Sequence, residues 1–108
     1  MIILKSHGFK FSRPEANIVF DASYLINPWR QKELRNSSKE KMLEFMESQK
    51  EFAKIVDMVV NSIITYQELW PDSKIVCAVC CSEGTYRSPM VIDAVARRLD
   101  NMKISYER

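Results

Sequence analysis

Apolar residues are distributed along the chain in two patterns. Short, nearly uninterrupted apolar runs at residues 2–4, 17–21 and 74–80 are rich in β-branched residues, and such runs predict β-strands. The third run does not alternate with polar residues, which favours a central strand buried on both faces. From about residue 38 to 68, apolar residues recur at intervals of three and four, and this spacing predicts one long amphipathic helix packed on the core. The positions on its stripe are Met42, Phe45, Met46, Phe52, Ile55, Val56, Val59, Val60 and Ile63.

The last third of the chain completes the predicted order of elements. Trp70-Pro71 ends the long helix, and a second helical pattern runs over residues 88–99 with Pro89 in its first turn. Residues 103–106 are interpreted as a final strand. The order strand, strand, helix, strand, helix, strand predicts an α/β domain of three layers with a small, mostly parallel, four-stranded sheet. Because ligands of such sheets bind beyond the carboxyl ends of the strands, we expect three loops to meet there, at residues 6–14, 21–30 and 81–88.

Length and composition bound the class of protein. A chain of 108 residues has the size of one domain, spanning residues 1–108. With 28% charged residues and only 2 glycines and 4 prolines, it is typical of globular proteins rather than of disordered or fibrous ones. No apolar run approaches the roughly 20 residues that cross a bilayer, and the first residues do not resemble a secretory signal. We therefore expect no membrane association and a cytoplasmic location.

The cysteines and the charges narrow the chemistry. Cys77, Cys80 and Cys81 lie within five residues, and the single histidine, His7, is far from them in sequence; this pattern predicts neither a disulfide framework nor a zinc site, and no cofactor is expected. Residues 1–41 carry eight Lys and Arg against four acids, whereas residues 42–108 carry eight against ten. The basic first part could follow a phosphate backbone, or it could be an ordinary solvated surface.

The loop at residues 81–88 carries the main chemical hypothesis. It joins the most apolar strand to a helix, and a helix N-terminus presents N–H groups that bind anions. Cys81 and Arg87 have the Cys-x5-Arg spacing with which cysteine phosphatases hold a phosphoryl group: a thiolate at Cys81 could attack phosphorus and Arg87 could grip two oxygens. One interpretation is therefore a cysteine-dependent phosphatase with Asp21 as the general acid. The motif superficially resembles that of low-molecular-weight tyrosine phosphatases, but it lies late in the chain and contains Glu83.

A second resemblance covers nearly the whole chain. The chain resembles the RapZ C-terminal domain family through Gly8-Phe9-Lys10-Phe11, Pro14, Ala16, Val19-Phe20-Asp21, Leu25, Asn27-Pro28-Trp29 and Leu34-Arg35, through the loop Cys80-Cys81-Ser82-Glu83-Gly84-Thr85-Tyr86-Arg87-Ser88, and through Tyr106-Glu107-Arg108 at the end. The resemblance implies a fold similar to a phosphofructokinase subdomain. It also implies an RNA-binding adapter that presents a small regulatory RNA to a ribonuclease, senses the phosphorylated sugar glucosamine-6-phosphate, and forms homo-oligomers.

The two lines of argument lead to one hypothesis about function. We expect a non-catalytic domain that binds RNA or a sugar phosphate through the loop at residues 81–88. Nearby charges and side chains at the ends of the other strands would assist it. The residues expected to hold or surround the ligand are Cys81, Ser82, Gly84, Thr85, Tyr86, Arg87, Ser88, Lys10, Arg13, Asp21 and Asn27.

Overall fold

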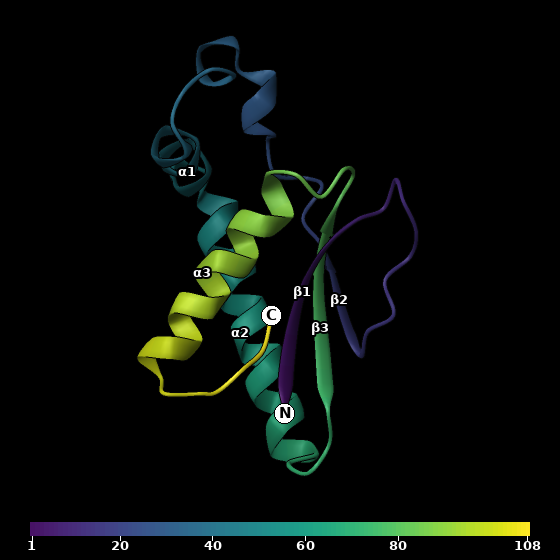
Figure 1. The fold of residues 1–108 in the computed structure, drawn as a ribbon. Coiled ribbons are helices and arrows are strands. Elements are labelled where there is room, and N and C mark those ends of the chain that lie inside the picture. Colours follow the sequence, from purple (N-terminus) through teal and green to yellow (C-terminus); the bar gives the residue numbers. More distant parts are fainter.

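Three parallel strands form the sheet, in the order β1-β3-β2 (Figure 1). The computed structural model describes all residues, 1–108. The strands are β1 (Ile2–Gly8), β2 (Ile18–Asp21) and the central β3 (Ile75–Cys81). The helices are α1 (Lys39–Ser48), α2 (Lys50–Leu69) and α3 (Arg87–Asn101), and two 3-10 turns lie at Pro28–Arg30 and Lys32–Leu34. The three predicted strands before residue 81, the helix end at Trp70 and the final helix are confirmed.

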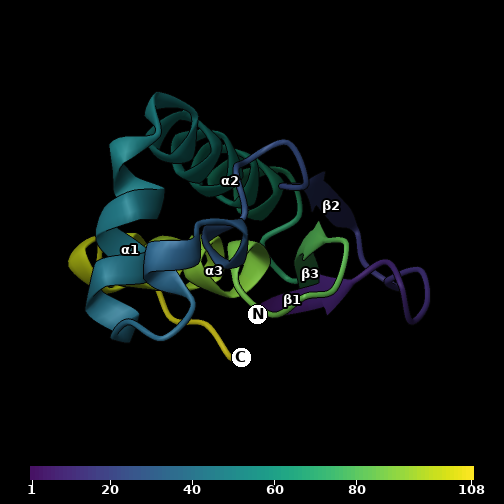
Figure 2. The ribbon, with the colours of Figure 1, turned by 90° about the horizontal axis from the view of Figure 1, so that it is seen from above.

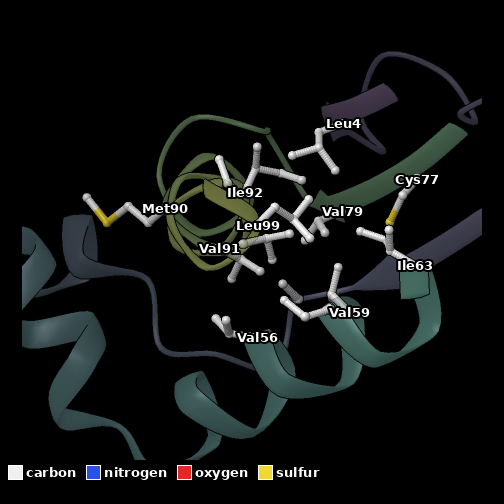
Figure 3. Close-up of a cluster of buried hydrophobic side chains, with 14 of the residues drawn as sticks. Leu4, Val56, Val59, Ile63, Cys77, Val79, Met90, Val91, Ile92 and Leu99 are labelled. Atoms are coloured by element: carbon white, nitrogen blue, oxygen red, sulfur yellow. The ribbon is translucent and has the colours of Figure 1, made fainter. Parts of the chain in front are cut away.

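Both long helices cover the same face of the sheet, so the domain has two main layers (Figures 1 and 2). Alternate strand residues, such as Leu4 and Val79, point into this layer. Figure 3 shows Val79 close to Val59 of α2 and Leu99 of α3, all three fully buried. The expectation of three layers is wrong because β1 and β2 are joined by only residues 9–17, too short a connection for a helix that would cover the other face.

The chain end does not form the predicted fourth strand. Residues 103–106 leave α3 through Lys103, whose φ of 59° lies in the left-handed region. Glu107 then forms a single bridge to Ile3, with two backbone hydrogen bonds of 2.8 Å to the residues on either side of Ile3. A sheet of three strands therefore replaces the predicted four.

The predicted long helix is divided at Gln49. Gln49 has an extended backbone with a ψ of 120°, so the α-helical hydrogen bonds of α1 stop there and those of α2 start anew. The Gln49 amide side chain accepts a hydrogen bond from the Ile26 N–H at 2.7 Å and donates one to the Ile26 carbonyl at 3.1 Å. Neither proline nor glycine marks the break, because its cause is a contact between segments 23 residues apart. No helix of the structure is long and apolar enough to cross a membrane.

Candidate anion-binding site

The loop between β3 and α3 lies at the carboxyl end of the central strand. We name residues 81–88 the β3–α3 loop. The chain leaving β1 continues beside it, where the Phe9 and Lys10 N–H groups donate to the carbonyls of Cys81 and Ser82 at 2.9 and 2.8 Å. On the other side, the Ala22 N–H at the end of β2 donates to the Cys80 carbonyl at 2.7 Å. The three loops predicted to meet at this edge of the sheet do meet.

The two glycines of the chain pack against each other at this point. A Cβ atom on Gly8 would lie 2.4 Å from the Glu83 carbonyl oxygen, and one on Gly84 would lie 2.7 Å from the Gly8 nitrogen. Gly84 also has a φ of 75°, a backbone angle that residues other than glycine rarely adopt. The close approach of the two backbones fixes the β3–α3 loop against the end of β1.

Polar groups converge on the sulfur of Cys81. The Gly84 N–H donates to Sγ at 3.2 Å, and the Ser88 Oγ lies 3.3 Å from Sγ. Ser88 is fully buried, and its hydroxyl also lies 3.3 Å from the Ser6 hydroxyl. Burial is the largest single influence on the Cys81 pKa and raises it, but the hydrogen bonds of Ser88 and Gly84 and the charge of Arg87 together lower the pKa below the usual 9.0. The loop therefore favours negative charge at this atom.

The other two cysteines have the opposite character. Burial, and to a smaller extent the neighbouring Cys80, raises the Cys77 pKa to about 12. Burial, followed by the charges of Asp21 and Cys81, raises the Cys80 pKa to about 11. No three His, Cys, Asp or Glu side chains gather in a way that could hold a metal ion.

Arg87 lies toward the segment that follows β2. Its Nη1 donates to the Ser23 carbonyl at 2.5 Å and to the Leu25 carbonyl at 3.2 Å. The side chain is half-buried. Because a guanidinium has five N–H donors and only those of Nη1 are used here, the side chain keeps hydrogen-bonding capacity for a ligand.

An aromatic stack joins the same two segments. Tyr86 stacks on Trp29 with ring centroids 6.0 Å apart and 7° between the planes. Arg35 donates from Nε to the Trp29 carbonyl at 2.7 Å, and its Cζ lies 5.7 Å from the centre of the Trp29 ring. Sequence reasoning missed Trp29, Arg35, Ser6 and Gly8 as parts of this site. Their partners are distant in sequence, although an aromatic residue directly after Asn27-Pro28 was a usable signal for Trp29.

Two predicted ligand residues have local structural roles. The Asp21 carboxylate accepts the Ser23 N–H at 2.8 Å, and the Asn27 amide oxygen accepts the Trp29 N–H at 3.1 Å at the start of a 3-10 turn. Asp21 pairs with Cys80 in the strand register. Since successive strand residues point to opposite faces, Asp21 lies on the face away from Cys81.

The remaining predicted residues are spread around the loop. Lys10 is exposed beside Ser82, whereas Arg13 is exposed farther along and lines a groove of about 550 Å³ with Phe9, Pro14 and Val19. Ser82 is exposed and has no side-chain hydrogen bond. Thr85 and Tyr86 line a separate hollow of about 280 Å³ at the side of α1. The structure thus places Lys10 and the 81–88 residues together and separates Arg13 from them.

The sequence of this chain matches a known protein family over its whole length and individual relatives over most of it. Residues 1–108 match the family described as the RapZ C-terminal domain. A nucleotide-binding protein of Caldanaerobacter subterraneus is 34% identical over 101 residues, which are 88% of this chain and 36% of that protein. A nucleotide-binding protein of Glaesserella parasuis is 31% identical, over 93% of this chain and 37% of that protein. The chain spans little more than a third of these relatives, and it belongs to the RapZ C-terminal domain family.

Proposed function

We propose that this domain binds the phosphate group of an RNA or of a sugar phosphate at the β3–α3 loop and leaves it chemically unchanged. The observation that carries the proposal is the convergence of the Gly84 N–H and the Ser88 hydroxyl on the Cys81 sulfur, at the N-terminus of α3. The N–H groups and the Arg87 charge that favour a negative sulfur would also favour an oxyanion held at the exposed outer side of the loop. The first N–H groups of a helix have no partner within the helix and are available to a ligand.

Charge and family membership support a phosphate-bearing ligand. Lys10 is exposed next to the loop, and the guanidinium of Arg87 could form a bidentate pair with phosphate through Nη1 and Nη2. The relatives carry the name nucleotide-binding protein, but the chain corresponds to only about a third of each. The proposal therefore also includes an adapter role, in which the domain presents a small regulatory RNA to a ribonuclease. It further includes homo-oligomers and a fold similar to a phosphofructokinase subdomain.

The phosphatase hypothesis has one observation in its favour, which is the lowered pKa of Cys81. Three features oppose it. Cys81 is only 2% exposed, so a substrate phosphorus has little access to its sulfur. Asp21 lies on the other face of the strand, and Nη1 of Arg87 is bound to the carbonyls of Ser23 and Leu25. Recognition without cleavage fits this geometry better.

Calorimetric titration with inorganic phosphate tests the proposal. We expect saturable binding that is lost in Arg87→Ala and retained in Arg97→Ala, which changes an exposed arginine on the same helix. Binding that is equal in both variants would contradict the role of Arg87, and absence of binding would contradict the proposed site.

Two further measurements separate the ligand classes and the enzyme alternative. If RNA binds through its phosphates, its affinity falls as salt rises, because counterions are released on binding; an affinity independent of salt would argue against RNA. We expect no turnover of para-nitrophenyl phosphate. Turnover that disappears in Cys81→Ser would establish the phosphatase instead.

A further inference from the structure

The β3–α3 loop holds the segment after β2 through two adjacent residues. We name residues 23–35 the cap segment. Arg87 donates to the carbonyls of Ser23 and Leu25, and Tyr86 stacks on Trp29. Figure 1 shows this part of the chain projecting beyond the carboxyl ends of the strands, next to the start of α3. The residues expected to contact a ligand are thus also the residues that hold the cap segment.

From this shared use of two residues we propose that phosphate bound at the β3–α3 loop competes with the cap segment for Arg87, so that ligand binding loosens the outer part of the cap segment. This inference rests on the proposed function. A guanidinium bonds more strongly to a phosphate oxygen than to a neutral carbonyl, because the acceptor is charged. A bidentate pair through Nη1 and Nη2 requires Nη1 to give up the carbonyls of Ser23 and Leu25, and the neighbouring Tyr86 shifts with Arg87.

The contacts within the cap segment indicate which part can move. Leu25 and Pro28 are buried, and the backbone of Ile26 is held by the two hydrogen bonds of Gln49. These contacts keep the base of the segment in place. Beyond Pro28 the segment consists of two 3-10 turns in which Trp29 is 45% exposed and Arg35 is exposed. Leu34 packs against the hydrophobic core at the far end of the segment, whereas the turn around Trp29 is held by the stack on Tyr86, and this turn is the part that ligand binding releases.

Phosphate binding and release of the cap segment affect each other reciprocally, and this reciprocity gives the decisive test. If the cap contacts stabilise only the phosphate-free state, weakening them makes phosphate bind more tightly. Trp29 does not lie in the loop, so Trp29→Ala removes a cap contact without removing a proposed phosphate donor. Aromatic pairs of this kind correspond to a change of roughly two- to tenfold in an equilibrium constant. We expect Trp29→Ala to bind inorganic phosphate tighter by that factor, measured by calorimetry at constant ionic strength. The matched control is Trp70→Ala, at a tryptophan with 51% exposure against 45% for Trp29, and it leaves the affinity unchanged.

A second measurement follows the cap segment directly. In Trp70→Phe the remaining tryptophan, Trp29, reports on the stack. We expect its fluorescence to change over the same phosphate concentrations that produce the calorimetric signal. Phosphate binding with no change in Trp29 emission, or with unchanged or weaker affinity in Trp29→Ala, would overturn the competition and leave the proposed function standing. Absence of phosphate binding to the unmodified protein would overturn both.

Discussion

Cys77 and Cys81 occupy the same face of one strand, four residues apart, and differ in almost everything else. Cys77 lies among apolar side chains and its pKa is raised to about 12, first by burial. Cys81 is nearly as buried, at 2% exposure, but its pKa is lowered by Ser88, Gly84 and Arg87 against the effect of burial. The comparison teaches that apolar packing sets the environment of β3 around Cys77, which we name its core end. At the carboxyl end, by Cys81, polar groups that tertiary contacts bring together set the environment instead.

Removing a large buried side chain from the core around this end has the largest expected effect on the free energy of unfolding. Leu99 is fully buried between α3 and the sheet. Leu99→Ala removes apolar contacts and leaves a cavity, so we expect the free energy of unfolding to fall by about 3 kcal/mol in urea denaturation. The control Leu69→Ala, at a leucine 59% exposed, changes it by less than about 0.5 kcal/mol. Equal losses in the two variants would contradict the assigned core.

The carboxyl end of β3 is disrupted by a side chain placed where the backbones of Gly8 and Gly84 approach each other. Gly8→Ala places a Cβ 2.4 Å from the Glu83 carbonyl oxygen, where only backbone movement can relieve the clash. We expect a loss of about 2 kcal/mol in the same denaturation experiment, together with weaker phosphate binding. Ser82→Ala, at an exposed neighbour, serves as the control and changes stability little. A stable Gly8→Ala variant with full phosphate affinity would show that the close approach is not required.

The two cysteines sharpen the comparison through pH. Cys81 has a lowered pKa in the folded state, so its contribution to stability is present above the thiol pKa of the unfolded chain and is lost as pH falls through the folded value. Cys77 has a raised pKa, so its contribution is complete below the unfolded value and is lost as pH rises toward 12. We expect Cys77→Ala to reduce the loss of stability at alkaline pH. We expect Cys81→Ser to destabilise more at pH 9 than at pH 6.

Ultraviolet absorbance of the thiolate measures the same difference directly. In the folded protein, the first thiolate to form on raising the pH should disappear in Cys81→Ser and persist in Cys77→Ala. The reverse order would show that Ser88 and Gly84 do not favour charge at Cys81.

The smallest expected effect lies outside both ends of β3. Arg98 and Asp57 form an ion pair of 2.6 Å between α3 and α2, with side chains 44% and 57% exposed. Solvent screens such a pair, and we expect Arg98→Ala to lower the free energy of unfolding by about 0.5 kcal/mol or less. A loss as large as that of Leu99→Ala would mean that the helix layer depends on this pair.

The apolar pattern was sufficient to predict the core end. The strands near residues 2–4, 17–21 and 74–80 and the helix after residue 87 are confirmed, because local periodicity reports which side of an element is buried. The break at Gln49 was not predictable in this way, because its side chain bonds to Ile26. The number of layers also depended on a tertiary property, the path of residues 9–17.

The carboxyl end was predicted only in part. The sequence indicated which loops meet, and the strand-to-helix change located the β3–α3 loop. It did not indicate that Arg87 would bond to the carbonyls of Ser23 and Leu25, or that Gly8 would touch Gly84. Those contacts join segments far apart in the chain, and residue spacing carries no information about them.

Backbone amide NMR during titration with inorganic phosphate tests the central claim most directly. The account predicts that the largest saturable shifts belong to the amides of residues 82–88, with smaller shifts in the cap segment at the same concentrations. Shifts confined to other parts of the surface, or no saturable shifts, would contradict phosphate binding at the β3–α3 loop.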